Sequence, residues 1–460
     1  MAARSESRHG MWSGRWLFIL AAAGSAVGLG NIWKFPYLAG ANGGAAFVLI
    51  YLACIALVGV PIMMAEVMLG REGRQSPINT MRALVRQHHR HPAWVLIGWL
   101  GVIAGFLILS YYVVIAGWAL HYIVEMARGA LAGATAAEAS GRFESFLQSP
   151  WRVVLWQTVF MAWTVYIIGR GVVKGLEAAI RWFMPLLFLI MIVLLGYALT
   201  TDGFRQGFEF MFGFDWAEVS GETVLAAMGQ AFFTLSLGMG AMMAYGAYLP
   251  SNTSIGSAVA TIVLLDTLVA LTAGLVIFPI VFTNGLQPDQ GPGLMFVTLP
   301  LAFGNMPLGS LFGTLFFVLV AFAAITSAIS IAEPTLAYLV ETYNAKRRRV
   351  SVSIGVIAWI IGLGTAFSFN LWSDVHFGGQ RTFFELVDHV SQNIMLPVGG
   401  MLIALFAAWA LPKTVIGAQL GFQAGWANVL WKLIAGVVAP LGVLAVFLVQ
   451  SGLVRGVFAP

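Results

Sequence analysis

Long apolar runs separated by short polar segments dominate the chain. They lie near residues 16–38, 44–70, 94–126, 151–169, 174–199, 223–249, 256–283, 307–340, 350–368, 382–410 and 426–449. A helix needs about 20 apolar residues to cross the hydrocarbon of a bilayer, and most of these runs reach that length. The pattern therefore predicts an all-α polytopic membrane protein with eleven transmembrane helices, in which residues 1–460 form one integral domain.

The composition excludes an ordinary soluble protein. Of the 460 residues, 60% are hydrophobic and only 9% are charged, whereas about a quarter are charged in soluble domains. A cleaved signal peptide is an alternative for the start of the chain, because Arg4, Arg8 and Arg15 precede an apolar run. That run continues into specific polar residues, which favours a retained first helix. The single cysteine, Cys54, lies within an apolar run and indicates no disulfide.

Lys and Arg are distributed unevenly between the segments that join the runs. With residues 1–15 as a cytoplasmic tail, fifteen basic residues fall on the cytoplasmic side and six on the other, which is the positive-inside bias. This predicts a multi-pass protein of the inner (cytoplasmic) membrane, with its N-terminus in the cytoplasm and its C-terminus outside. The net charge of +5 then reflects topology and contact with an anionic lipid surface. We expect the lipid bilayer as a partner, and no nucleic acid.

Two of the runs are interrupted by glycines. The first contains GSAVGLGN from Gly24 to Asn31, and the sixth contains TLSLGMGA from Thr234 to Ala241. A broken helix exposes backbone amides and carbonyls, so a break persists in a membrane only where it is buried or lines a cavity. The Gly24 and Gly28 spacing alone also serves close helix packing. The second, matching break favours a binding site over packing.

The positions of the breaks also suggest an internal symmetry. They fall at corresponding places in two halves of five runs each, residues 16–199 and 223–410, with the run at 426–449 added at the end. Inverted repeats with paired broken helices are typical of secondary transporters, where the freed carbonyls face cations and half-helix N-termini face anionic groups. A central binding site at the two breaks is therefore predicted.

Several polar residues fall inside apolar runs, where ionisable groups are costly and usually face the interior of the bundle. Glu66 is expected to tie broken backbone together, and Gln230 to serve as a second structural polar residue. Asp266, surrounded by apolar neighbours, is expected to coordinate a cation. Glu333 lies in the eighth run. The sequence has no His and Cys cluster with metal-ligand spacing and no phosphate-binding loop, so no enzyme is predicted.

Five motifs resemble the neurotransmitter:sodium symporter family, in its bacterial eleven-helix branch of amino-acid transporters. They are GSAVGLGNIWKFPY (Gly24 to Tyr37), NGG (Asn42 to Gly44), SYY (Ser110 to Tyr112), GQAFFTLSLGMGA (Gly229 to Ala241) and AAITSAIS (Ala323 to Ser330). The similarity runs from about Trp12 to the tenth run. It implies a five-plus-five inverted-repeat (LeuT-type) fold with unwound helices 1 and 6. It also implies sodium-coupled symport of amino acids by alternating access.

The resemblance assigns two sodium sites by position. The first would use Ala26, Asn31, Thr234 and Asp266, completed by the carboxylate of the substrate. The second would use Gly24, Val27, Ala323, Thr326 and Ser327.

It also assigns the substrate site. The substrate carboxylate would meet the backbone of Leu29 and Gly30 and the hydroxyl of Tyr112. The ammonium group would meet Ala26, Phe233, Thr234 and Ser236. The side-chain pocket would be lined by Ile108, Phe233, Met239, Ser327 and Ile331, which predicts a hydrophobic or aromatic L-amino acid.

Two gates are implied in the same way. Lys34 and Asp388 would close the outer side, where relatives commonly have Arg in place of Lys and therefore a bidentate fork. Tyr248 and Glu341 would close the inner side, with Arg8 as their basic partner. Pro36 is expected to restart the first helix beyond its break.

Gly175 and Pro185 have the spacing seen in relatives whose helix 5 unwinds on the cytoplasmic side, and both residues weaken a helix. The resemblance therefore implies that this segment opens and hydrates the second sodium site. Asp266 replaces an asparagine of many relatives, and Ala270 stands where chloride-dependent members have a hydroxyl. A fixed carboxylate can balance the charge of sodium, so sodium and no chloride is expected. With eleven helices rather than twelve, a monomer or weak dimer is predicted.

Two other functions remain open at this stage. One is a membrane sensor that binds an amino acid without moving it. The other is a proton-coupled exchanger of the same architecture, in which Asp266 or Glu333 would titrate.

Overall fold

The computed structural model describes residues 12–214, 219–288, 293–379, 381–421 and 425–450. Within them the chain is built from helices: α1 (Arg15–Ala26), α2 (Phe35–Ala41), α3 (Ala45–Cys54), α4 (Val60–Gly73), α5 (Pro77–Gln87), α6 (Leu96–Ala127), α7 (Ala136–Leu147), α8 (Pro150–Gly169), α9 (Ala178–Ala198), α10 (Phe204–Phe212), α11 (Gly221–Thr234), α12 (Ala241–Ala247), α13 (Ile255–Thr283), α14 (Leu299–Gly304), α15 (Gly309–Tyr343), α16 (Arg347–Phe367), α17 (Phe383–Asp388), α18 (Leu396–Leu405), α19 (Lys413–Leu420), α20 (Gly425–Leu433) and α21 (Ala439–Gln450).

Short helical segments of other kinds join several of these. Wide π-helical turns form η1 (Gly30–Lys34), η2 (Ile55–Gly59), η4 (Val172–Glu177), η6 (Leu294–Thr298), η7 (His389–Met395), η8 (Phe406–Ala410) and η9 (Ile434–Val438), and a 3-10 turn forms η3 (Pro92–Val95). Because π turns often mark functional positions within helices, η1 and η7 are of interest below.

The number of membrane-crossing helices depends on how broken helices are counted. In the described residues, nine helices are long and apolar enough to span a bilayer, and the bent pair of Arg15–Ala26 with Gly30–Ala41 makes a tenth. The sixth run, expected at 223–249, consists of the two shorter helices α11 and α12, separated by residues 235–240. If each broken helix is counted as one span, eleven spans are predicted, and this number stays a prediction.

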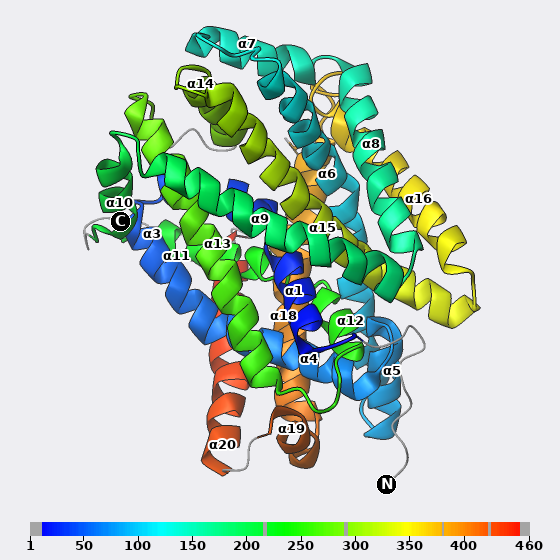
Figure 1. The fold of residues 1–460 in the computed structure, drawn as a ribbon. Helices are drawn as coiled ribbons and strands as arrows, with labels where there is room; N and C mark the ends of the chain where they lie inside the picture. Colours follow the sequence, from blue (N-terminus) through cyan, green and yellow to red (C-terminus); the bar gives the residue numbers. More distant parts are fainter. Residues whose placement is uncertain (1–11, 215–218, 289–292, 380, 422–424, 451–460) are drawn as a thin grey trace.

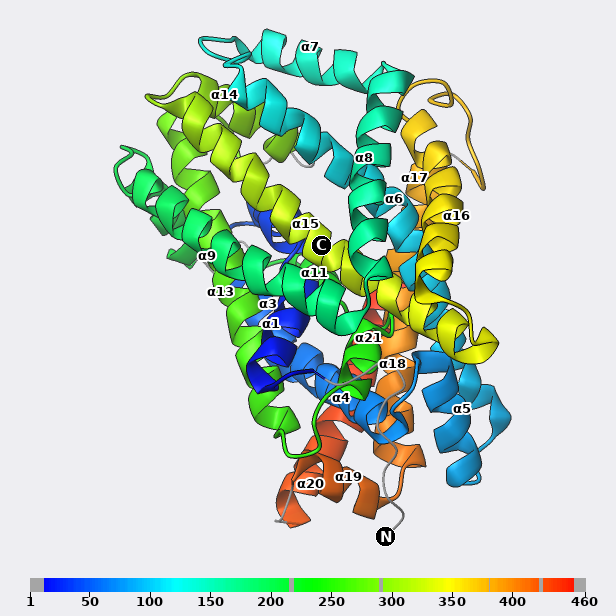
Figure 2. The same ribbon diagram turned by 45° about the vertical axis from the view of Figure 1, so that its right-hand side comes forward.

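The long helices run between two ends of the molecule (Figure 1). Helices α7 and α14 lie at one end and α5, α19 and α20 at the other, and a second view agrees (Figure 2). We call the end with α5 the inner end, following the predicted charge bias, and the opposite end the outer end. Helix α15 packs along α6, α16 packs against α8, and α1 packs between α13 and α15.

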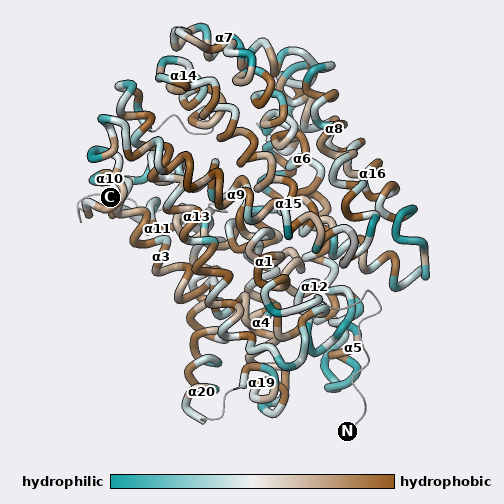
Figure 3. The backbone as a smooth tube through the Cα atoms, viewed as in Figure 1, coloured by the Kyte–Doolittle hydropathy of each residue, from teal (hydrophilic) through white to brown (hydrophobic). Residues whose placement is uncertain are grey.

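Hydrophobic residues follow the long helices, and hydrophilic residues gather at α5 and around the ends of the molecule (Figure 3). Many large apolar side chains point outward from the bundle. On α9 and α16 these exposed residues are Trp182, Leu186, Leu189, Ile192, Val193, Val352, Val356, Ile357 and Ile360. Such an apolar exterior is the surface expected of a helix bundle immersed in lipid.

The segments that join the long helices at the outer end contain short helices. Helix α7 begins with a capping box, in which the Thr135 hydroxyl accepts from the backbone of Glu138 and the Glu138 side chain accepts from the backbone of Thr135. Such reciprocal bonds satisfy free amides at a helix start. Helices α10 and α14 occupy the next two outer segments.

Candidate functional site

The first helix is broken just where its glycines lie. Helix α1 ends at Ala26, and the backbone of Val27 is extended, with φ −69° and ψ 100°. The chain becomes helical again at Gly30, and the two halves are bent by 48°. The expectation that Pro36 restarts the helix is therefore wrong. A wide π turn already precedes Pro36, whose ring and missing N–H are accommodated in the first turn of α2.

The second break joins α11 to α12 in an unusual backbone conformation. Ser236, Gly238 and Gly240 all have positive φ, at 53°, 81° and 75°. Glycine adopts this region without strain, but serine rarely does. The Ser236 hydroxyl donates to the carbonyl oxygen of Ser25 at 3.0 Å. This bond joins the two breaks directly.

Glu66 and Gln230 each attach to one of the breaks. Glu66 lies on α4 and accepts a hydrogen bond from the amide of Gly238 at 2.8 Å. Gln230 lies on α11 and donates to the carbonyl of Gly30 at 2.7 Å. Both side chains are fully buried. Glu66 thus satisfies an amide that has no helical partner, whereas Gln230 adds a second bond to a carbonyl that also accepts from the amide of Phe35.

The side chains assigned to the first sodium site lie together. The amide nitrogen of Asn31 donates to Asp266 Oδ1 at 2.7 Å, and the hydroxyl of Thr234 donates to the same oxygen at 3.0 Å. The side-chain oxygen of Asn31 accepts from the amide of Gly28 at 3.1 Å. Asn31 and Asp266 are fully buried, and Thr234 and Ala26 nearly so. Three helices thus supply one buried cluster of oxygen atoms.

The residues assigned to the second sodium site also meet. The Ser327 hydroxyl lies 3.4, 3.1 and 3.4 Å from the carbonyl oxygens of Gly24, Ser25 and Val27. Thr326 bonds back to its own helix, including the carbonyl of Ala323 at 3.0 Å. A Cβ atom on Gly24 would lie 3.3 Å from the Cβ of Thr326, so α1 and α15 approach closely here. Three carbonyls from the end of α1 therefore converge on α15.

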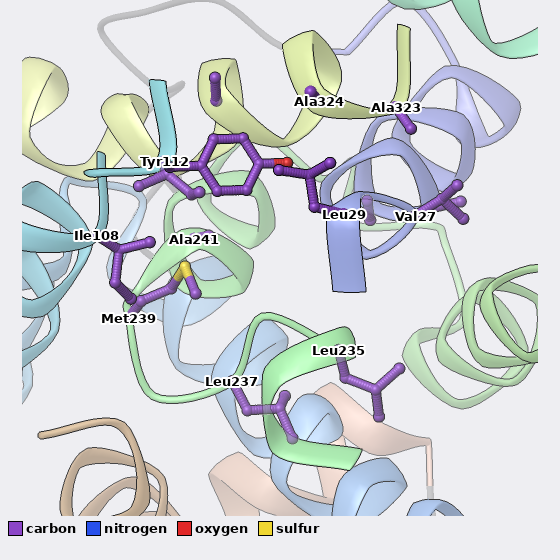
Figure 4. Packing of buried hydrophobic residues seen from close by; sticks show 14 of the residues in the cluster. Val27, Leu29, Ile108, Tyr112, Leu235, Leu237, Met239, Ala241, Ala323 and Ala324 are labelled. Atoms are coloured by element: carbon purple, nitrogen blue, oxygen red, sulfur yellow. The ribbon is translucent and has the colours of Figure 1, made fainter. Parts of the chain in front are cut away.

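A cavity with an empty volume of about 300 Å³ lies between the two breaks. Ten of the eleven residues expected at the substrate site line it, and Thr234 instead faces Asp266. Figure 4 shows Tyr112 extending from α6 with its hydroxyl toward Leu29, while Ile108 and Met239 lie side by side. The Tyr112 hydroxyl is buried and has no hydrogen-bond partner among the described residues. An unpaired buried hydroxyl in a cavity indicates a place for a polar ligand group.

Sequence analysis missed two residues that line the cavity, Ser25 and Gly28. Both lie inside the broken segment, which was the signal that could have identified them. A Cβ atom on Gly28 would come within 2.4 Å of the Ser327 hydroxyl and 3.2 Å of the Tyr112 hydroxyl. Gly28 is therefore required because polar atoms of the cavity occupy the space of a side chain.

The two residues assigned to the outer gate are joined by a third side chain that was not predicted. In the described part of the chain, the ammonium of Lys34 donates to the side-chain oxygen of Gln392 at 2.9 Å and is not paired directly with Asp388. The side-chain nitrogen of Gln392 donates to Asp388 and, at 2.8 Å, to the hydroxyl of Tyr111. The same ammonium lies 4.4 Å from the centre of the Phe233 ring.

Phe233 separates two spaces. It lines the central cavity and also an outer vestibule of about 850 Å³, to which Lys34, Asp388 and Gln392 contribute. The gate residues therefore lie directly outside the predicted substrate site.

At the inner end, Tyr248 donates to Glu333 at 3.0 Å, and Arg347 forms a buried ion pair with the same carboxylate. The indole of Trp12 donates to the carbonyl of Tyr245 at 3.2 Å. Arg347 and Glu333 were not expected to form part of the inner gate.

The other predicted member of this gate, Glu341, accepts bonds from Ser76 and Asn79 beside α5. Its expected basic partner, Arg8, lies outside the described residues.

The segment of helix 5 that is expected to unwind is helical here. Gly175 lies in the π turn η4, and Pro185 lies within α9. Glu177, at the end of η4, is 1% exposed and connects the start of this helix to the segment before α1. Its carboxylate accepts from both the amide and the hydroxyl of Ser13, each at 2.8 Å. The opening predicted for this segment concerns another state of the protein and stays a prediction.

Comparison with known proteins decides the family. The model described as the sodium:neurotransmitter symporter family matches residues 9–145 and 142–455. The chain belongs to this family. The match covers nearly the whole chain, including both breaks and the cavity between them.

Two sodium-dependent transporters are similar to this chain over nearly their whole length. The uncharacterized sodium-dependent transporter YhdH of Bacillus subtilis (strain 168) is 40% identical over 452 residues, which are 98% of this chain and 99% of that protein. An uncharacterized sodium-dependent transporter of Methanocaldococcus jannaschii is 31% identical over 96% of this chain and 90% of its own length.

A solved structure shows the same fold. The crystal structure of MhsT in complex with L-phenylalanine is 41% identical in sequence, has a TM-score of 0.88, and covers 95% of this chain and 99% of its own. The predicted family and fold class are thus confirmed. The protein is a multi-pass membrane transporter of a sodium-dependent symporter family and not an enzyme.

Proposed function

We propose that this transporter moves hydrophobic or aromatic L-amino acids across the inner (cytoplasmic) membrane, into the cell, together with sodium and without chloride. The observation that carries the proposal is the central cavity, which is lined by the buried, unpaired hydroxyl of Tyr112 and by Ala26 and Ser327 from the two assigned sodium sites. The related MhsT was crystallised with L-phenylalanine, which supports a substrate of this class.

The oxygen clusters suit sodium ions. The cluster at Ser327 combines its hydroxyl with backbone carbonyls, and the cluster at Asn31 combines the side chains of Asn31 and Thr234 with the carboxylate of Asp266. Unwound carbonyls of broken helices are typical sodium ligands in transporters of this kind. Ala26, Asn31, Thr234 and Asp266 would hold one ion. Gly24, Val27, Ala323, Thr326 and Ser327 would hold the other.

The cavity suits an amino acid with an apolar side chain. Ile108, Met239 and Ile331 supply an apolar wall. At the other side, the Tyr112 hydroxyl and the backbone of Leu29 and Gly30 lie where a carboxylate would gain hydrogen bonds, because an N–H at the start of a half-helix attracts anions. The carbonyl of Ala26 would accept from the substrate ammonium.

Asp266 is the basis for the proposed chloride independence. Its carboxylate lies in the buried cluster at 2.7 Å from the Asn31 amide and 3.0 Å from the Thr234 hydroxyl. A fixed negative charge at this point can balance the charge of a cation without a mobile anion.

Uptake into proteoliposomes tests the function. We expect an inward sodium gradient, with gluconate replacing chloride on both sides, to drive accumulation of radiolabelled L-phenylalanine. Equal uptake in potassium would refute sodium coupling, and uptake that needs chloride would refute the anion independence. Sodium-independent uptake that follows a pH gradient would favour an exchanger. Binding without uptake would favour a sensor.

A single hydroxyl tests the site. Tyr112→Phe removes the unpaired hydroxyl and leaves the ring, so binding of L-phenylalanine in sodium should weaken by about 10- to 100-fold, as expected for a lost hydrogen bond to a charged group. Tyr122→Phe is a matched control, because Tyr122 is a buried tyrosine on the same helix outside the cavity. Equal affinity in the two variants would contradict the assigned site.

A further inference from the structure

Gln392 lies at the centre of the outer gate. It is partly buried within the π turn η7, one turn beyond Asp388 on the same helix. Its side chain faces Lys34 from the first broken helix and Tyr111 from α6. Three separate segments of the chain therefore meet at one amide.

Each atom of this amide has a partner of the matching kind. The carbonyl oxygen, which can only accept, faces the ammonium of Lys34 at 2.9 Å. The NH₂ group, which can only donate, faces the carboxylate of Asp388 and the hydroxyl of Tyr111. Because an amide has both a donor and an acceptor end, it can join a cation to an anion that do not touch.

We propose that Gln392 is a positioning residue of the outer gate, which relays the charge of Asp388 to Lys34 and holds the Lys34 ammonium over the Phe233 ring. This inference rests on the proposed function, because it concerns release of the substrate from the central cavity. The gate of this protein is therefore a chain of three side chains and not a direct ion pair.

The relay explains why a lysine is sufficient at position 34. An ammonium is a compact point charge without the fork of a guanidinium. Here Gln392 bridges the space between the ammonium of Lys34 and the carboxylate of Asp388. The ammonium also contacts the face of Phe233 at 4.4 Å from the ring centre, a favourable cation–π geometry. Phe233 lines both the vestibule and the cavity. Loss of the relay would thus loosen the ring that covers the substrate.

The test measures how fast bound L-phenylalanine leaves the purified full-length protein in sodium after dilution into unlabelled ligand. Gln392→Leu should accelerate release by about tenfold, the effect expected of one lost hydrogen bond to a charged group. Gln392→Met is a second variant of nearly unchanged length, in case the leucine variant is unstable. Asn393→Leu is the matched control, because Asn393 lies in the same π turn but bonds to His389.

Combined variants distinguish a relay from a general loss of packing. If Asp388 acts through Gln392, then Gln392→Leu with Asp388→Asn should release substrate no faster than Gln392→Leu alone. In a Lys34→Arg background, where the longer fork can reach Asp388, Gln392→Leu should have little effect. The relay would be overturned if release from the Gln392→Leu and Asp388→Asn double variant were faster than from Gln392→Leu alone. It would also be overturned if Gln392→Leu accelerated release fully in the Lys34→Arg background, or if Asn393→Leu accelerated release as much as Gln392→Leu.

The two proposals fail in different ways. If the wild-type protein binds no amino acid in sodium, the proposed function is wrong. If binding is normal and release from the Gln392 variants is unchanged, only the relay is wrong.

Discussion

At the scale of single residues, Gly28 determines how closely the two sides of the cavity approach. A Cβ atom there would lie 2.4 Å from the Ser327 hydroxyl, so Gly28→Ala must push Ser327 away from the carbonyls of the broken helix. We expect sodium-dependent binding of L-phenylalanine to weaken by about 1–3 kcal/mol, the usual cost of overpacking. Binding by the purified variant measures this.

The control for this change is Gly196→Ala. Gly196 lies in α9 and a Cβ atom there would meet nothing within 4 Å, so the same substitution should leave binding unchanged and raise stability by about 0.4–1 kcal/mol. Unchanged binding by Gly28→Ala would show that Ser327 can move without harm to the site.

Asp266 is the second residue whose role can be isolated. Asp266→Asn keeps the shape and an oxygen that can accept from the Asn31 amide, which lies 2.7 Å from the carboxylate, but it removes the negative charge. The sodium concentration for half-maximal substrate binding should rise at least about tenfold, corresponding to about 1.4 kcal/mol. Binding at a series of sodium concentrations tests this, and an unchanged midpoint in a folded variant would contradict cation coordination by Asp266.

At the scale of helices, much was predictable from hydrophobic runs. The apolar run at 256–283 corresponds to the observed helix Ile255–Thr283, and the run at 307–340 corresponds to the observed helix Gly309–Tyr343. Both breaks were predicted, because glycines inside an apolar run are a local signal. The π turns were not predicted, because a wider turn leaves no pattern in the sequence. The expected role of Pro36 was wrong for this reason, since η1 lies before it.

The side-chain networks were harder to predict than the helices. The resemblance to the family predicted that Lys34 and Asp388 are paired. It did not predict Gln392, which bonds to Lys34 across 358 positions and has no local signal in the sequence. The same holds for Tyr248 and Glu333, which are 85 positions apart. Such partners depend on how helices are packed, and hydropathy does not encode that packing.

The start of helix 5 is an element whose stability can be tested. Glu177 binds both the amide and the hydroxyl of Ser13, so it fastens η4 to the segment before α1. Glu177→Gln replaces one acceptor by a donor and should increase hydrogen exchange in residues 172–180 by about tenfold, the effect of about 1.4 kcal/mol on local opening. Mass spectrometry of the exchanged peptides measures this in sodium and in potassium.

A distant carboxylate provides the control for helix 5. Glu138→Gln alters an exposed capping box in α7 at the outer end and should leave exchange at 172–180 unchanged. Removal of sodium should increase exchange in the wild type at the same peptide, as predicted for unwinding between Gly175 and Pro185. Identical exchange in both cations would count against that unwinding.

At the scale of the whole molecule, the proposed transport requires that the central cavity open to one side at a time. At the inner end, Tyr248, Glu333 and Arg347 form a buried network, and the Trp12 ring packs edge-on against Tyr245 at 5.4 Å between ring centres. Removing Arg347 alone would leave Glu333 buried without its counter-charge, which costs about 3–5 kcal/mol and endangers folding. Tyr248→Phe is the milder change, because it removes one hydroxyl and keeps the ring.

This variant should shift the protein toward a state that is open at the inner end. Cys54 is the single cysteine, so Cys54→Ala provides a background in which a cysteine at Ser25, beside the cavity, is the only target for a thiol reagent. Loss of one hydrogen bond of about 1 kcal/mol should raise the open population about fivefold.

A reagent supplied only from the inner side of proteoliposomes should therefore label the Tyr248→Phe protein about fivefold faster. If sodium and substrate bind between the two breaks as proposed, both together should suppress the labelling. Equal labelling rates with and without the Tyr248 hydroxyl would show that this network does not hold the inner end closed.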